Sequence, residues 1–452
     1  MKLENSNKIN IRTLLKLTIP IFLELILQVL LGNVDKVMVR NDASANAINQ
    51  ANSILDMLTM SISVLAAGSL ILINQYKGAQ DKTSEKKIYS LAFFFNLLLG
   101  VVLGLFLLIF ANPILTIMNV SPEFFDEAAI YLRINGGFLF LQSIILTLST
   151  FLRSNAYGVE GFIVSGAFNV LNVCMNALFL YIFKLPGVTA VAIATVISRV
   201  IGCIALFIMI AKLPKIKLSL KESFNTINEL KKLLKISIPS AGESFSYSLS
   251  QIVILTIINI IGLKLSKAAP TAKTYVNIMV QFTFIFTSSV TQAMQIMLGR
   301  YLGARNTEAA DKLIRKTLVL SIVSSIGIAL IQALLAKPIY SLFTKDQEVI
   351  NLCIQIICIE IALEIGRAIN ITLVRAFQTS GDVFFPTLLA IIFCWGVAVL
   401  GSYLLGVIFN LGIIGVWIAM TIDELARGAI FLIRFKKGGW KKRNLISNLN
   451  LE

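Results

Sequence analysis

The sequence contains no histidine, and the five cysteines among its 452 residues show no CxxC spacing. Without histidine the chain lacks the commonest metal ligand and the imidazole proton relay. The cysteines all fall inside apolar stretches, which is typical of small core residues and argues against disulfides and metal ligands. Any proton or cation chemistry must therefore run on carboxylates. The cysteines are Cys174, Cys203, Cys353, Cys358 and Cys394.

Charged residues are also scarce, at 14% of the chain, whereas 57% of the residues are hydrophobic and the mean hydropathy is +0.83. This composition excludes an ordinary soluble domain and leaves room for about a dozen spans of ~20–26 residues. A net charge of +16 would suit nucleic acid, but no soluble segment carries a basic patch interleaved with aromatic residues. A nucleic-acid partner is therefore not expected.

Long apolar runs, separated by turn and charge signals, predict an all-α membrane protein with twelve transmembrane helices. Asn112-Pro113 is interpreted as a signal that stops the third helix. The predicted spans cover about residues 14–39, 47–74, 88–110, 127–152, 160–183, 188–211, 233–262, 271–299, 313–336, 347–376, 384–409 and 413–435.

The positive charges are distributed unevenly between the two sides of these spans. The N-terminus, the loops after even-numbered spans, the C-terminus and the adjoining span ends hold 28 of the 40 Lys and Arg residues, and seven lie on the other side. The positive-inside rule then places both termini in the cytoplasm. We expect a multi-pass protein of a prokaryotic plasma membrane. No cleavable signal peptide is evident, because residues 1–12 are polar and the first apolar run is too long.

Segments of the first half recur in the second half. Residues 75–81, QYKGAQD, correspond to residues 300–306, RYLGARN. Pro20 and Glu24 recur as Pro239 and Glu243, and Arg153 recurs as Arg375. Because six spans separate equivalent points, both halves enter the membrane from the same side. The sequence thus predicts a parallel internal repeat of two pseudo-symmetric six-helix bundles.

Three segments follow from this repeat. We expect an N-lobe with the first six helices at residues 1–212, a cytoplasmic linker at 213–232, and a C-lobe with the other six helices at 233–452. Within the linker, apolar residues recur at roughly helical spacing beside many lysines. This pattern favours a surface helix that rests on the anionic cytoplasmic leaflet.

The first span carries Glu24, Gln28 and Asp35, whose spacing puts them on one face of a continuous helix. A charged group inside a span costs several kcal/mol, so it is a functional candidate by default. The counterpart of Asp35 in the second half is Ile254, so this acid is specific to the N-lobe. We predict that Asp35 binds a cation or proton. The alternatives are a pair with Lys36 or a solvated position at the outer surface.

Glu24 and Glu243 are further candidates for cation or proton coupling, and they occupy symmetric positions one turn after a proline. The structural alternative is that they bond to backbone groups freed by Pro20 and Pro239. Because a carboxylate in a low dielectric holds a proton more readily than one in water, it can exchange that proton for a sodium ion or a cationic substrate.

The tenth span holds the densest cluster, Glu360, Glu364 and Arg367, at spacings of four and three. Glu364 can pair with Arg367 within the helix, which leaves one carboxylate in excess. We predict that both acids take part in coupling, with Asp35 and Glu364 as possible Na⁺ ligands. The twelfth span carries an acidic pair and an arginine that favour a structural ion-paired patch: Asp423, Glu424 and Arg427.

Polar residues inside other spans are predicted to line a substrate cavity. In the fifth span, Asn169, Asn172 and Asn176 share a face suited to interhelical hydrogen bonds. The predicted cavity residues are Gln28, Tyr247, Gln251, Gln281, Asn172 and Asn176, and Gln292 and Gln295 are further candidates.

Taken together, several motifs resemble the multidrug and toxic compound extrusion (MATE) family of secondary transporters. They lie at residues 14–39, 75–81 with 300–306, 190–199 and 415–440. The resemblance covers nearly the whole chain. It implies two six-helix bundles that form a V-shaped cleft. It also implies efflux of amphipathic, often cationic compounds in exchange for Na⁺ or H⁺.

The same resemblance assigns some site residues and leaves others open. Asp35 matches the family's first-helix aspartate, and Glu364 falls where one bacterial branch has an acid in the tenth helix. The seventh-helix glutamate of that branch falls at Tyr247, and the acid here is Glu243, one turn earlier. Another branch has an aspartate in the fifth helix, where this chain has only asparagines. The coupling ion is therefore open, and no other cofactor is expected.

Two rival functions remain. A lipid-linked precursor flippase has a related fold, but the buried charge here is mostly acidic, which favours a cationic cargo. An intramembrane enzyme would need a nucleophile with a base, or a set of metal ligands, and the sequence offers neither. We therefore predict an antiporter that is not an enzyme. Its expected partners are a small amphipathic substrate and the lipid bilayer, and it is expected to be a monomer.

Overall fold

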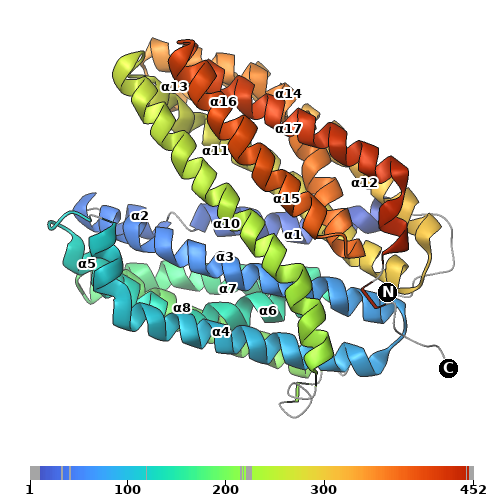
Figure 1. The fold of residues 1–452 in the computed structure, drawn as a ribbon. Helices are drawn as coiled ribbons and strands as arrows, with labels where there is room; N and C mark the ends of the chain where they lie inside the picture. The colour runs from blue at the N-terminus through green and yellow to red at the C-terminus, as the bar shows by residue number, and fades with distance from the viewer. Residues whose placement is uncertain are drawn as a thin grey trace. The chain divides into compact units, whose positions relative to one another are not determined.

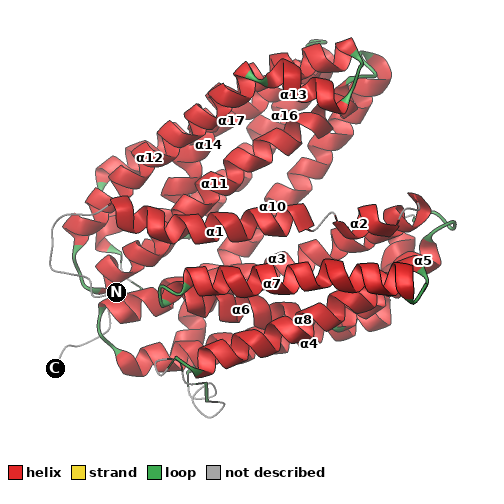
Figure 2. Ribbon diagram, turned by 180° about the vertical axis from the view of Figure 1, so that it is seen from behind, coloured by secondary structure: helices red, strands yellow, loops and turns green. Residues whose placement is uncertain are grey.

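The computed structural model shows helices joined by turns and short loops (Figures 1 and 2). The chain divides into two compact units, Ile19–Ser237 and Ile238–Glu452, and residues 2–18 group with the second. We call them the first and second units. The structure describes residues 11–31, 34–39, 42–118, 120–213, 216, 218–219, 226–443 and 445–446.

Most helices of the first half are long enough to cross a bilayer. Two of them are interrupted, one by a bend and one by a closing π-helical turn. The helices are α1 (Ile11–Leu31), α2 (Val34–Val39), α3 (Asp42–Gly78), α4 (Lys82–Ile117), α5 (Phe125–Gly137), α6 (Leu139–Ser154), α7 (Gly158–Ala177), the π-helix η1 (Leu178–Ile182) and α8 (Gly187–Ala211).

The second half repeats this plan, with a short helix after α12 and π-helical segments in its eleventh span. Its helices are α10 (Ile227–Lys264), α11 (Ala269–Gly303), α12 (Thr307–Leu334), α13 (Ala336–Phe343), α14 (Gln347–Ser380), α15 (Phe384–Phe393), η2 (Cys394–Val399), α16 (Leu400–Tyr403), η3 (Leu404–Ile408), α17 (Gly412–Lys437) and the 3₁₀ turn η4 (Gly439–Lys442).

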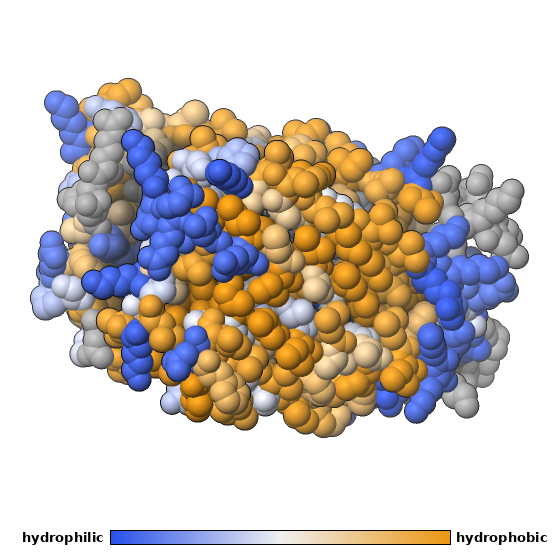
Figure 3. Space-filling model, turned by 90° about the horizontal axis from the view of Figure 1, so that it is seen from above, coloured by the Kyte–Doolittle hydropathy of each residue, from blue (hydrophilic) through white to orange (hydrophobic). Residues whose placement is uncertain are grey.

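These helices group into the twelve predicted spans. Among the described residues, eight helices have the length and apolar composition to cross a membrane, or nine when bent α5 and α6 count as one. The other three spans are α1 with α2, α11, and α17. On the face shown in Figure 3, apolar side chains form a broad band with hydrophilic side chains at both ends. The prediction of an all-α multi-pass membrane protein is confirmed.

Two predicted helix limits are wrong. The first span is not one continuous helix from 14 to 39: α1 ends at Leu31 and Asp35 lies in the separate helix α2. The third span does not stop at Asn112-Pro113, because α4 continues through Pro113 to Ile117. Proline removes only one backbone donor, and the loss is tolerated in a membrane helix when neighbouring groups compensate.

The fourth predicted span is bent by 47° where α5 meets α6. The bend follows a pair of glycines, Gly136 and Gly137, which pack against α4. A Cβ atom at Gly136 would lie 2.6 Å from Leu107, and one at Gly137 would lie 2.8 Å from Leu108. The glycines therefore allow the close approach of α5 to α4 and give the helix a place to bend.

The backbone repeats as the sequence does. Gln80 and Arg305, equivalent residues of the repeated motif, both have left-handed φ angles, of 61° and 56°. The next residue in each motif is an N-cap whose side chain accepts backbone N–H bonds, Asp81 for α4 and Asn306 for α12. Left-handed φ angles also recur at two further pairs of corresponding positions, Ala156 with Gly381 and Lys184 with Asn410.

Each unit has its own apolar core. In the first unit the core joins α3, α4, α5 and α8, and in the second it joins α10, α11, α14 and α17. The predicted linker at 213–232 falls largely outside the described residues, and α10 begins within it, at Ile227. The core of the second unit surrounds α14, which packs against α11, α12 and α17 and carries the acidic cluster described below.

Candidate functional site

Glu24 and Glu243 each lie near an arginine of the same half. In the first unit, Arg153 of α6 bonds Glu24 of α1 at 3.3 Å (Nη2–Oε1), and Glu24 is 3% exposed. In the second unit, Glu243 of α10 lies within electrostatic range of Arg375 of α14 and accepts a hydrogen bond from Thr387 at 3.4 Å. The arginines are repeat equivalents, so the two halves balance these acids in the same way.

Asp35 faces amides of α7. The Asn176 side chain donates a hydrogen bond to the Asp35 carboxylate at 2.7 Å. One turn earlier, Asn172 bonds Thr195 of α8 at 3.3 Å. Asn176 is fully buried, and its side-chain oxygen has no hydrogen-bond partner within the described ranges. The prediction that the fifth-span asparagines make interhelical hydrogen bonds is confirmed for these two, whereas Asn169 bonds the backbone of its own helix.

More side chains surround Asp35 than the sequence analysis named. Arg199 of α8 and Tyr131 of α5 lie within electrostatic range of it, and Asp56 of α3 lies near both. Asn52, one turn before Asp56, hydrogen-bonds the buried Tyr131 side chain. Arg199 and Asp56 were visible in the sequence as charges within spans. Tyr131 and Asn52 gave no signal above that of an ordinary helical residue.

Two fully buried carboxylates of α14 share one guanidinium. Arg367 donates to Glu360 at 2.8 Å and also bonds Glu364. Glu360 and Glu364 are each 1% exposed. Trp417 of α17 donates its indole N–H to the other oxygen of Glu360 at 2.7 Å. One Glu364 oxygen is buried without a hydrogen-bond partner among the described residues.

The patch on α17 joins this cluster. Arg427 bonds Asp423 at 2.5 Å and Glu424 at 3.0 Å, which confirms the predicted ion pairs. Asn370 of α14 donates to the Glu424 backbone oxygen at 2.8 Å. Glu424 also lies within electrostatic range of Glu364. We call the four acids and two arginines the α14/α17 cluster: Glu360, Glu364, Asp423, Glu424, Arg367 and Arg427.

A glycine brings the two helices of this cluster together. A Cβ atom at Gly366 would lie 2.6–2.8 Å from backbone atoms of Glu424 and Leu425. Real Cβ atoms do not approach that closely, so only glycine permits this packing. Because Gly366 lies between Glu364 and Arg367, the approach of α17 also sets the position of their charges.

The remaining predicted cavity residues are spread over α1, α10 and α11 and differ in exposure. Tyr247 is 46% exposed and lies within electrostatic range of Arg367 and Glu424. The glutamines range from exposed to half-buried to buried: Gln28 and Gln281 are exposed, Gln251 and Gln292 are half-buried, and Gln295 is buried.

The predicted common face of the first span is wrong. Glu24 and Gln28 share the helix α1, whereas Asp35 lies in α2. The helical spacing that placed the three residues on one face applies only along an unbroken helix.

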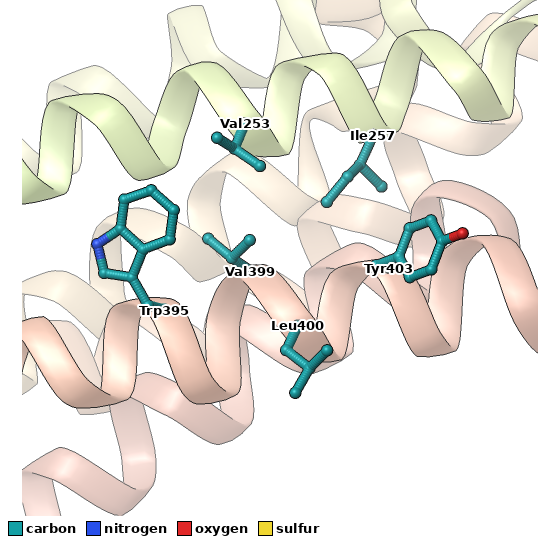
Figure 4. A pocket seen from close by; sticks show the side chains of 6 residues that line it. All are labelled: Val253, Ile257, Trp395, Val399, Leu400 and Tyr403. Carbon is teal, nitrogen blue, oxygen red and sulfur yellow. The ribbon is translucent and has the colours of Figure 1, made fainter.

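An apolar pocket of about 470 Å³ lies beside α10 in the second unit (Figure 4). Trp395 and Tyr403 stand at its two ends, and aliphatic side chains from α10 and from the segments η2 and α16 lie between them. Its lining residues are Val253, Ile257, Trp395, Val399, Leu400 and Tyr403.

The arrangement suits proton or monovalent cation binding better than a multidentate metal site. Within the described ranges, no group of three or more His, Cys, Asp or Glu side chains has the geometry to hold a metal ion. The α14/α17 cluster nevertheless holds four carboxylates against two guanidinium groups. The fold and this buried excess of acid are those of a duplicated helical membrane transporter.

Comparison with known proteins identifies the family. The MatE family model matches residues 20–178 and matches again at residues 239–404. The two matches begin at Pro20 and Pro239, which are equivalent residues of the sequence repeat. This chain belongs to the MATE family, whose members are multidrug efflux transporters and not enzymes.

Relatives and solved structures agree over nearly the whole length. The chain is 32% identical to the uncharacterized transporter YisQ of Bacillus subtilis, over 96% of each chain. It is 25% identical to the probable multidrug resistance protein NorM of Thermotoga maritima, over 96% of this chain and 94% of that one. A MATE crystal structure in the bent conformation superposes with a TM-score of 0.88 at 18% identity, covering 95% and 96% of the two chains. The fold is therefore that of two six-helix bundles.

Proposed function

We propose that this protein is a secondary antiporter that exports amphipathic, cationic compounds in exchange for Na⁺ or H⁺. The observation that carries the proposal is the α14/α17 cluster, in which four buried or half-buried carboxylates share two guanidinium groups. An uncompensated buried carboxylate is costly, so the cluster gains stability when it takes up a proton or a cation. Such a site can couple one gradient to another.

The site at Asp35 is a second coupling candidate. Its carboxylate lies beside an amide donor, and the neighbouring Asn176 oxygen is buried. A sodium ion prefers oxygen ligands, and a proton on Asp35 would give this oxygen a donor. Glu24 and Glu243 are weaker candidates, because arginines of their own halves lie close to them.

Coupling follows if cation and substrate bind with different preference to two arrangements of the protein. A ligand shifts a conformational equilibrium only by its difference in affinity for the two states. Entry of a proton or sodium ion then favours one arrangement, and loss of the ion with binding of a cationic substrate favours the other. The apolar pocket between α10 and the eleventh span offers a wall for the apolar part of such a substrate.

The orientation in the membrane is part of the proposal. Basic residues beside both termini and the even-numbered loops support cytoplasmic termini, and bacterial relatives support a prokaryotic plasma membrane. We further propose that one chain is the working unit, since each of the two clusters is built from residues of a single unit.

The test is movement of a fluorescent cationic dye across the membrane of proteoliposomes under an imposed Na⁺ or H⁺ gradient. Wild type is compared with Asp35→Asn and Glu364→Gln. Glu308→Gln is the matched control, because Glu308 is an exposed acid paired with Lys312 at the start of α12. We expect gradient-driven movement in wild type and in the control, and loss of coupling in at least one of the two site variants.

Each outcome decides between named functions. Dye movement with one gradient only identifies the coupling ion. If neither gradient moves the dye while a fluorescent lipid-linked precursor crosses the bilayer, the antiporter proposal fails and a flippase function replaces it. If both site variants transport like wild type, the buried acids do not couple.

A further inference from the structure

A second pocket of the second unit lies on the surface between α12 and α17, and none of its lining residues belongs to the acidic cluster. It has a volume of about 370 Å³. Its lining combines two basic residues with aliphatic side chains and one aromatic ring. The residues are Arg315, Leu318, Val319, Leu432, Phe435 and Lys436.

The charges in this pocket sit at one level of the membrane. Arg315 lies about two turns, or about 12 Å, along the axis from the start of α12. Lys436 is the penultimate residue of α17. One turn deeper in each helix the same face is apolar, with Val319 after Arg315 and Leu432 before Lys436. The pocket therefore has a cationic end near the membrane surface and an apolar end toward the bilayer interior.

The guanidinium of Arg315 is held in place by its neighbours. Its Nε atom donates to Asp311 at 2.6 Å, and its centre lies 5.2 Å from the Phe435 ring. Phe435 in turn stacks on Trp440, with ring centroids 5.7 Å apart. These contacts fix the group while its terminal nitrogens remain available as donors.

The local charge is positive. Asp311 is bonded by both Arg315 and Lys441, which lies 2.9 Å from its second oxygen. Lys436 makes no hydrogen bond or ion pair within the described part of the chain. One carboxylate thus stands against three cations here. A pocket of this charge disfavours a neutral or cationic occupant at its polar end.

The apolar end continues along a lipid-facing ridge. Val319 is 61% exposed, and Val323, one turn deeper on the same face of α12, is 63% exposed. Aliphatic side chains exposed inside a span face acyl chains, because in this region no water is present. An occupant must therefore carry an anionic head and a hydrocarbon tail.

We propose that this pocket binds an anionic phospholipid, with the phosphate at Arg315 and Lys436 and an acyl chain along Val319 and Val323. Under the orientation proposed above, the lipid belongs to the cytoplasmic leaflet. The inference does not rest on the transport proposal, since none of its residues belongs to the α14/α17 cluster or to the Asp35 site.

The test is native mass spectrometry of the purified full-length protein with phosphatidylglycerol and with phosphatidylcholine of the same acyl chains. The variants are Arg315→Gln, Lys436→Gln and the double variant. Lys437→Gln is the matched control, because Lys437 is the exposed neighbour of Lys436 and does not line the pocket. Each removed charge should weaken phosphatidylglycerol binding about fivefold, and the double variant about 25-fold.

A further variant, Val319→Trp, fills the apolar end and keeps both charges. It should weaken the binding of phosphatidylglycerol without a change in the thermal unfolding of the protein. The proposal is overturned if phosphatidylcholine binds as well as phosphatidylglycerol, or if Lys437→Gln weakens binding as much as Lys436→Gln. It is also overturned if the pocket variants change only the fraction of dimers in the spectra.

Discussion

The acidic side chains within the spans differ in what neutralises them. Glu24 has a guanidinium to itself at 3.3 Å, whereas Glu360 and Glu364 share Arg367. Asp35 meets an amide donor on one side. A carboxylate with its own buried cation is already balanced, so it gains little from a proton or a sodium ion. This difference ranks Glu24 below the other candidates as a coupling site.

We predict that Glu24→Gln mainly lowers stability. The change leaves Arg153, whose side chain is 13% exposed, without the carboxylate it bonds. Breaking a buried ion pair from one side costs about 3–5 kcal/mol. Thermal unfolding of the detergent-purified protein should therefore shift to lower temperature, and Glu24→Gln with Arg153→Gln should recover part of the loss.

The control for this experiment is Glu308→Gln, which breaks an exposed ion pair and should leave unfolding unchanged. A contrary result would be a Glu24→Gln protein as stable as wild type that no longer couples transport to an ion gradient. That result would return Glu24 to the coupling site.

At the scale of elements, small residues decide how closely the helices approach. Without a hydrophobic driving force inside the bilayer, helix association depends on packing and interhelical hydrogen bonds. Gly136 and Gly137 let α5 meet α4, and Gly366 lets α14 meet α17. The last of these contacts matters for chemistry, because it assembles the α14/α17 cluster.

We predict that Gly366→Ala separates α14 from α17. The new Cβ atom would meet backbone atoms at 2.6–2.8 Å, and a backbone cannot move aside as a flexible side chain can. Overpacking of this kind costs about 1–3 kcal/mol. Both the unfolding temperature and gradient-driven transport should fall.

Gly327→Ala is the matched control, since Gly327 also lies within a spanning helix, α12, and nothing lies within 4 Å of its added Cβ atom. Alanine there should leave stability unchanged or raise it, because glycine is the poorer helix former. Equal losses in the two variants would show that the close contact at Gly366 is unimportant.

At the scale of the whole molecule, the charge distribution predicts the orientation in the membrane. Lys82 begins α4 after the first repeated motif, and Lys267 lies in the turn between α10 and α11. Both side chains are exposed. The positive-inside rule places Lys82 in the cytoplasm and Lys267 outside.

We predict that a membrane-impermeant maleimide labels Lys267→Cys in intact cells and labels Lys82→Cys only after the cells are opened. Both substitutions are made in a protein whose five native cysteines have been replaced. The native cysteines need replacement because Cys174 and Cys358 are exposed. The opposite labelling pattern would invert the topology and place the proposed lipid pocket in the outer leaflet.

The sequence by itself determined the class of this protein, because the signals for that class are local. A span shows as an apolar run, a duplication as repeated residues, and a turn with left-handed φ as the recurring motif at 75–81 and 300–306. Buried acids are rare enough within spans that they stand out as candidates. The two wrong helix limits, at Pro113 and before Asp35, are places where context overrides a local signal.

Only the tertiary structure decided which charges meet. Arg153 is 129 residues from Glu24, Trp417 is 57 from Glu360, and Asn370 is 54 from Glu424. Spacing along one helix fixes the face on which a side chain lies, but it cannot fix the rotation and height of the helix packed against it. Those depend on contacts such as that of Gly366, where the absence of a single Cβ atom sets the distance between two helices.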